Sequence, residues 1–185
     1  ALAIRRKAFG EQHALVAQVQ RDIAAVHEAQ GDYAAALAVY QQVLAIDEAT
    51  LAADHPFVAD TLGQLARVQR LRGQYARALA LLERALAIDL KANGPEHSSV
   101  AGRLGGQAAV YRAMGQAEAA LALDRRALAI EERAAGPRSG LVAGRLHAVA
   151  ASLERLGRFE EARQATEQAL AIDQQLHGSE HRSVA

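Results

Sequence analysis

The sequence repeats itself every 42 residues, and this period constrains the fold more than any other feature. The repeated motif is Ala-Leu-Ala-Ile, with valine in place of the first alanine in one copy and with an acidic residue after the isoleucine in all but the first. Its copies begin at Ala1, Val43, Ala85, Ala127 and Ala169. A register that holds over four periods predicts a stack of equal units. The alternative is an alanine-rich helical bundle, which gives no reason for a fixed spacing.

The period also predicts the organisation of the chain. We expect one array of four repeats, with partial repeats at residues 1–10 and 179–185, cut from a longer protein. The four complete repeats are expected at residues 11–52, 53–94, 95–136 and 137–178.

Each period reads as two helices. In the second period, Asp54-His55-Pro56 provides a polar helix start with proline in the first turn, and apolar residues then recur at helical spacing up to Gly73. This predicts a first helix over about 56–72, here called the A helix. A longer second helix, the B helix, is expected from Tyr75 to about Ala92, because Asn93-Gly94-Pro95 ends it.

Small residues recur where two helices must cross closely. One alanine position recurs on the A helices and a second on the B helices, and a third small position follows seven residues later. These rows are Ala24, Ala66, Ala108 and Ala150; Ala36, Ala78, Ala120 and Ala162; and Val43, Ala85, Ala127 and Ala169. Larger residues such as Leu62 and Tyr40 are expected between hairpins. At Asp124 and Thr166 the row that contains Tyr40 turns polar, which predicts looser packing there.

Composition excludes several classes of function. Lysine and arginine total 21 and so do aspartate and glutamate, so no net charge attracts nucleic acid or an anionic membrane. The absence of cysteine excludes disulfides and thiolate metal sites. Apolar runs are too short to cross a bilayer. We expect a cytoplasmic protein, and the excess of arginine over lysine suggests a GC-rich bacterial genome.

These residues resemble the tetratricopeptide repeat. The resemblance rests on the alanine pair and on glycine followed by an aromatic residue, as in Gly31-Asp32-Tyr33 and Gly73-Gln74-Tyr75. The long unit is similar to the kinesin-light-chain type. The resemblance implies an all-α fold, a right-handed α-solenoid of antiparallel helix hairpins. It also implies that the A helices form a concave groove for a peptide or partner segment.

The positions that flank the alanine row of the A helices are expected to face this groove. The candidate partner-binding residues are Gln18, Arg21, Asp60, Arg67, Arg70, Arg112, His147 and Arg155. Arginine forks suit carboxylates, so the partner is expected to be acidic. The alternative is a solvated face neutralised by Glu28, Asp60 or Glu154. Gly102, Gly105 and Gly106 are expected either to admit a ligand close to the backbone or to reflect sequence drift.

We expect no catalytic, cofactor or metal site. Catalytic and phosphate-binding motifs are absent, and carboxylates are expected on outward faces or at helix caps. His13, His55, His97 and His181 recur with the period, but neighbouring repeats stand too far apart, roughly 10 Å, for one ion. These histidines are expected to fix the start of the A helices.

The sequence therefore predicts a non-catalytic protein-interaction module, a scaffold or adaptor that binds no nucleic acid and no membrane. Two alternatives stay open. The chain is either a structural element that associates end to end, or a sensor arm of a larger multidomain protein.

Overall fold

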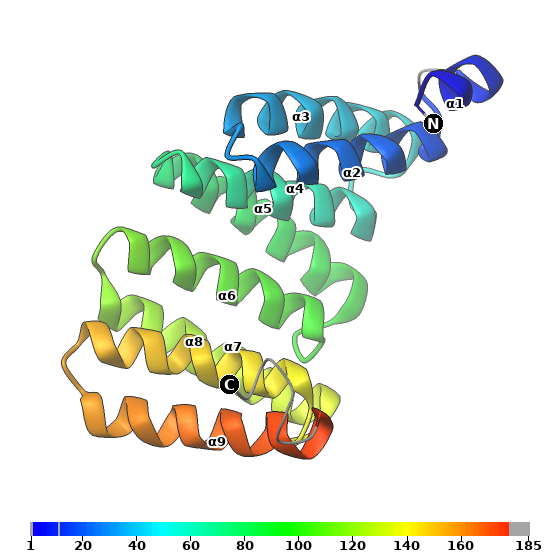
Figure 1. Cartoon of the computed structure of the whole chain (residues 1–185). Coiled ribbons are helices and arrows are strands. Elements are labelled where there is room, and N and C mark those ends of the chain that lie inside the picture. The colour runs from blue at the N-terminus through cyan, green and yellow to red at the C-terminus, as the bar shows by residue number, and fades with distance from the viewer. Residues whose placement is uncertain (1, 11, 178–185) are drawn as a thin grey trace. The chain divides into compact units, whose positions relative to one another are not determined.

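The computed structural model describes residues 2–10 and 12–177, which form nine helices and no strand (Figure 1). Contacts divide the chain into two compact units, Ala1–Ala92 and Asn93–Ala185. The all-α fold and the helix hairpins predicted from the sequence are confirmed within each unit.

The first unit contains five helices. The A helices are α2 and α4, and the B helices are α1, α3 and α5. Their bounds are α1 Leu2–Phe9, α2 Ala14–Ala29, α3 Tyr33–Thr50, α4 Pro56–Leu71 and α5 Tyr75–Asn93. Helix α3 packs against α2 on one side and against α4 on the other. The bounds of α4 and α5 agree with the predicted helices to within one residue at each end.

The second unit repeats this arrangement with two hairpins. The A helices α6 and α8 alternate with the B helices α7 and α9. Their bounds are α6 Ser98–Ala113, α7 Ala117–Ala135, α8 Gly140–Arg155 and α9 Phe159–His177. Helix α7 contacts both α6 and α8, and α8 contacts α9.

Histidines cap three of the four A helices, as predicted. The ring Nδ1 of His13, His55 and His97 accepts the backbone N–H of the residue two positions on, at 3.1, 3.2 and 3.2 Å. The hydroxyl of Ser139 takes this role for α8, accepting the N–H of Val142 at 3.3 Å. Each side chain satisfies one of the backbone donors that a helix start leaves free. His181 lies outside the described residues.

The turn inside the first hairpin shows why glycine recurs there. Gly31 has φ of +75°, although a Cβ at this position would meet nothing within 4 Å. Backbone conformation, not space, therefore selects glycine. Asp32 follows and caps α3 by accepting the N–H of Ala35 at 3.0 Å.

The recurrent alanines form the core, as the period predicts. Ala24 and Ala36 meet in one cluster with Tyr40 of the first hairpin and Leu65 and Val68 of α4. Every member of the three small rows is buried. Small side chains hold the two helices of a hairpin close together, and larger ones fill the space between hairpins.

No helix in the part of the chain that the structure describes is both long and apolar enough to cross a membrane.

Candidate binding face of the A helices

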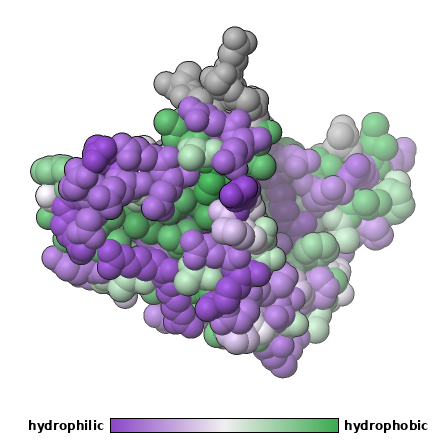
Figure 2. Space-filling model, turned by 90° about the horizontal axis from the view of Figure 1, so that it is seen from below, coloured by the Kyte–Doolittle hydropathy of each residue, from purple (hydrophilic) through white to green (hydrophobic). Residues whose placement is uncertain are grey.

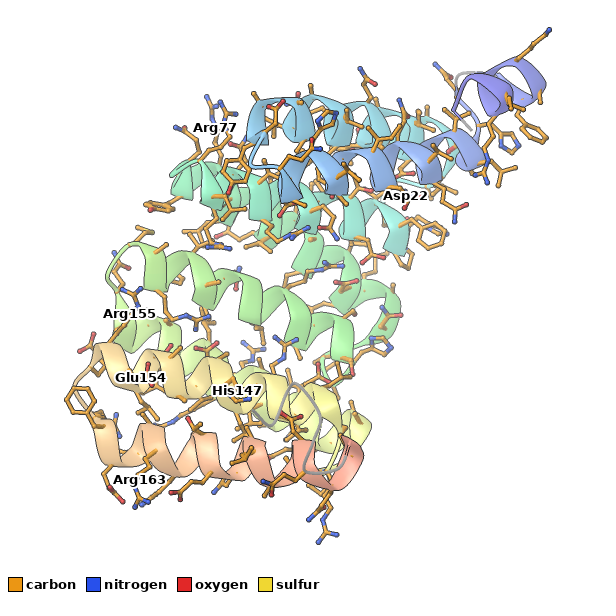
Figure 3. The ribbon with its side chains drawn as sticks, viewed as in Figure 1. Asp22, Arg77, His147, Glu154, Arg155 and Arg163 are labelled. Carbon is orange, nitrogen blue, oxygen red and sulfur yellow. The ribbon has the colours of Figure 1, made fainter. Side chains whose placement is uncertain are left out.

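All eight candidate residues lie on A helices. Gln18 and Arg21 belong to α2 and Arg112 to α6. Helix α4 carries Asp60, Arg67 and Arg70, and α8 carries His147 and Arg155, of which the last two are labelled in Figure 3. The structure places most of the arginines against carboxylates of the chain itself, so the charge of this face depends on those pairs.

Arg21 is held by a buried carboxylate of the B helix. Its Nη2 atom donates to both oxygens of Asp47 at 2.7 and 2.6 Å, and the Asp47 side chain is only 4% exposed. The hydroxyl of Thr61 on α4 donates to the same carboxylate at 2.7 Å. The Arg21 guanidinium also lies 5.8 Å from the centre of the Phe57 ring. Asp47 thus joins α2, α3 and α4.

A related arrangement occurs in the second unit. Glu131 of α7 accepts the hydroxyl of Ser98 on α6 at 2.8 Å and lies 3.4 Å from Nη2 of Arg145 on α8. In the last hairpin, Nε2 of His147 lies 3.8 Å from Asp173. An acid of the B helix therefore contacts an A helix in each case.

These carboxylates correct one prediction from the sequence. The acidic residue after each Ala-Leu-Ala-Ile motif was expected on an outward face or at a cap, but it is buried in all four complete repeats. The buried acids are Asp47, Asp89, Glu131 and Asp173. The hydrogen bonds of Asp47 and Glu131 supply the physical reason, because a buried carboxylate is tolerated where donors from neighbouring helices satisfy it.

Arg145 explains one of the glycines on this face. A Cβ at Gly105 would overlap the Arg145 guanidinium, which also lies near Gly102. Gly105 therefore provides space for a side chain of the protein that pairs with Glu131. A Cβ added at Gly144 of α8 would meet nothing within 4 Å in the described part of the chain, so the backbone is open there. Sequence reasoning missed Arg145, although it stands one period after Arg103 and two periods after Thr61, at a position that is polar in three repeats.

Arg67 belongs to a partly buried polar cluster in the first unit. Its Nη1 atom lies 2.6 Å from a carboxylate oxygen of Glu28, whose side chain is 8% exposed, and its Nη2 donates to Gln64 at 2.8 Å. Tyr40 lies beside this pair, and burial, followed by the charge of Glu28, raises the pKa of its hydroxyl. For Arg67 the structure therefore supports the alternative from the sequence, in which Glu28 neutralises its charge within the chain.

Arg112 is largely buried, because its side chain is 17% exposed and pairs with Asp124 of α7, which is fully buried. Ser152 of α8 donates to the same carboxylate at 2.7 Å and accepts from Arg112 at 3.1 Å. Burial raises the pKa of Asp124, although Ser152 and Arg112 act in the opposite direction. The prediction of looser packing at Asp124 is wrong, because this network fills the site.

The Glu28–Arg67–Tyr40 cluster and the Arg112–Asp124–Ser152 cluster share two positions of the repeat. Two periods separate Glu28 from Arg112, and also Tyr40 from Asp124. The shared A-helix position holds an acid, Glu28, in the first unit and a cation, Arg112, in the second, and the shared B-helix position holds Tyr40 and Asp124. Both clusters combine an acid, an arginine and a hydroxyl. Asp124 and Ser152 each replace an apolar or aromatic residue found one period earlier, Leu82 and Val110. Two polar replacements in neighbouring helices were the sequence signal for this cluster.

The remaining candidates differ in their surroundings. Gln18, Asp60 and Arg155 are exposed or nearly so, and Arg70 is half-buried. Arg70 and Arg155 form no ion pair within residues 2–10 and 12–177. No group of three or more acidic or histidine side chains in that part of the chain has a metal-binding arrangement. The face thus combines a few available arginines with many internally paired charges.

Comparison with known families agrees with this geometry. A sequence profile described as tetratricopeptide repeat matches residues 1–49, 23–91 and 99–175, most of the chain. The chain belongs to the tetratricopeptide repeat family. Its repeats are of the kinesin-light-chain-like kind. No curated protein matches the chain in sequence.

Solved structures share the fold. The chain resembles the nearly identical TPR-like repeats of a Podosopora anserina kinesin light chain, with 28% identity, a TM-score of 0.71, and coverage of 95% of this chain and 83% of that one. BtubC (BKLC) from P. vanneervenii has 19% identity and a TM-score of 0.75, with coverage of 89% and 65%. A Rap protein complexed with Competence and Sporulation Factor has 18% identity and a TM-score of 0.71, with coverage of 84% and 42%.

Proposed function

We propose that this tetratricopeptide repeat chain is a non-catalytic scaffold or adaptor that binds an acidic partner segment along the exposed face of its A helices, in the cytoplasm of a bacterium. The observation that carries the proposal lies in the second unit, where Gly144 leaves the backbone of α8 open while His147 is half-exposed and Arg155 has no ion pair in the described residues. An extended segment can approach such a backbone closely.

The proposed contacts differ in strength along this face. Arg70 and Arg155 are the strongest candidates for carboxylates, since neither has an ion-pair partner in the described residues that it must first leave. Three arginines, Arg21, Arg67 and Arg112, already pair with buried or half-buried acids of the chain. A guanidinium has five N–H donors, so each of them would bind the partner through N–H groups that the internal pair does not use. The full set of proposed contacts is Gln18, Arg21, Asp60, Arg67, Arg70, Arg112, His147 and Arg155.

The test is a display selection of random decapeptides against the whole chain, followed by fluorescence anisotropy of the best binders. We expect enrichment in aspartate and glutamate and affinity that falls with added salt. Arg155→Glu should weaken binding about tenfold. Arg126→Glu changes an exposed arginine of the B helix α7 and should leave binding unchanged. Equal effects of the two substitutions would refute the proposal.

One observation favours a second candidate, end-to-end self-association. Helices α8 and α9 border a pocket of about 270 Å³ whose apolar lining includes Phe159, Ala162 and Leu170. Phe159 is 70% exposed. In the view from below, hydrophobic residues form a strip bordered by hydrophilic ones (Figure 2). A strip of this kind suits a helix of a second copy.

Sedimentation velocity across a dilution series separates this candidate from a monomeric scaffold. If copies associate through the α8 and α9 face, the sedimentation coefficient should rise with concentration and Phe159→Ser should abolish the rise. Phe57→Ser, at another exposed phenylalanine, serves as the control. A coefficient independent of concentration would eliminate self-association.

A further inference from the structure

A second surface site lies on the B-helix side of the first unit. Helices α3, α4 and α5 enclose an open pocket of about 330 Å³, within the size range of small-molecule sites, roughly 300–1,000 Å³. Leu37, Leu44, Leu65 and Leu81 supply most of its apolar lining. All of these leucines except Leu65 are only partly buried, so the pocket is open to solvent.

Three polar side chains complete the lining. Gln69 of α4 is 6% exposed, and its buried amide oxygen has no hydrogen-bond partner among the residues that the structure describes. Gln41 and Arg77 are exposed and polar. Arg77 projects from the first turn of α5 (Figure 3) and forms no ion pair within the described residues. Judged by residues 2–10 and 12–177, the pocket therefore combines apolar surface with one unsatisfied acceptor and one unpaired cation.

The second unit lacks this combination at the equivalent positions. Leu153 stands two periods after Gln69 and packs into an apolar cluster. Glu161 stands in the place of Arg77 and lies 3.5 Å from Arg125. The second unit thus has leucine and an internal ion pair at these two positions, so the polar lining of the pocket belongs to the first unit and is not produced by the repeat itself.

We propose that the pocket of the first unit binds the C-terminal residue of a peptide with an aliphatic side chain. The side chain enters the leucine cluster, and the terminal carboxylate pairs with Arg77. The Gln69 amide turns so that its oxygen, buried in the free chain, accepts the backbone N–H of the residue. A fatty acid has no N–H for Gln69, and a small anion has no group for the leucines. This site is separate from the proposed A-helix face, because its lining comes mainly from B helices.

The test uses the whole chain with isotope-labelled leucine methyl groups and N-acetyl-leucine as the probe. N-acetyl-leucine should shift the methyl signals of Leu37, Leu44, Leu65 and Leu81 in a saturable manner. Its methyl amide lacks the carboxylate, octanoate lacks the N–H, and N-acetylglycine lacks the side chain. Each should bind about tenfold more weakly or worse.

Two substitutions copied from the second unit identify the polar contacts. Arg77→Glu should make N-acetyl-leucine and its methyl amide bind alike or reverse their order, and Gln69→Leu should weaken both about tenfold. Gln69→Leu removes an unsatisfied buried group, so the fold should tolerate it. Arg126→Glu is the control and should change nothing. The proposal fails if N-acetyl-leucine gives no saturable shift, if octanoate binds equally well, or if Arg77→Glu preserves the preference for the carboxylate.

Discussion

Removal of Arg112 tests whether the fully buried carboxylate of Asp124 depends on its ion pair. Apart from Arg112, the only described donor to this carboxylate is Ser152, and one oxygen of Asp124 has no partner. Taking one member from a buried ion pair costs about 3–5 kcal/mol because an uncompensated charge remains. We therefore expect Arg112→Leu to lower the free energy of unfolding by about 3 kcal/mol near pH 7, the lower end of that range because Ser152 remains.

The cost should depend on pH. Burial raises the pKa of Asp124 in the folded chain, so the folded state holds this proton more tightly than the unfolded state, whose pKa is about 3.9. Ionisation of this group therefore lowers stability as pH rises between the two pKa values. Loss of Arg112 raises the folded pKa further. The deficit of Arg112→Leu should thus be greatest above the folded pKa and shrink on acidification.

Urea unfolding followed by far-ultraviolet circular dichroism measures this at several pH values. The triple variant Arg112→Leu, Asp124→Leu, Ser152→Val restores the apolar rows that contain Leu82 and Val110. It should recover most of the lost stability, since a well-packed apolar replacement of a buried ion pair is often neutral or stabilising. A cost below about 1 kcal/mol, or one that does not change with pH, would refute the reasoning.

Three further substitutions test the packing of the repeat by the same unfolding assay. Gly144→Ala should stabilise α8 by about 0.5–1 kcal/mol, whereas Gly105→Ala should gain less because its Cβ displaces a guanidinium; equal gains would contradict the structure. His55→Ala should cost about 1 kcal/mol and His55→Ser almost nothing, and equal costs would exclude a capping role. Ala66→Leu should cost about 1–3 kcal/mol, and a neutral result would mean that the alanine row does not set the helix spacing.

The sequence predicts much of the fold because residues that recur with the 42-residue period mark the positions where helices pack, turn and begin. An alanine at each crossing, a glycine at each turn and a histidine or serine at each helix start are local requirements that every repeat must meet. The bounds of α4 followed from Pro56 and Gly73 for this reason. Such features need no knowledge of a partner side chain.

The ion pairs could not be predicted in the same way. A periodic hydrophobic pattern assigns charged residues to the surface, and it gives no reason to bury Asp47 or Asp124. Their burial depends on donors from helices that are distant in sequence, such as Thr61 and Ser152. The acid that follows each Ala-Leu-Ala-Ile motif recurs with the period and could be found in the sequence. Its donors could not be predicted, because they differ from repeat to repeat.

The sequence predicted which helices carry the eight candidate residues, but not which of their side chains are already paired within the chain. All eight residues lie on the expected helices, yet Arg21, Arg67 and Arg112 are engaged with carboxylates of the chain. A helical projection predicts the side of the helix on which a residue lies. It does not predict whether a long side chain bends back to pair with a neighbouring helix. Arg145 was missed because its role depends on the empty space at Gly105.

Mapping of a bound segment by amide chemical-shift perturbation tests the proposed function most directly. An acidic decapeptide from the display selection should perturb residues along the exposed face of α6 and α8 or of α2 and α4, with His147 and Arg155 or Arg70 among them. Perturbations confined to the B helices, or a peptide that binds equally well after Arg70→Glu and Arg155→Glu together, would contradict the account.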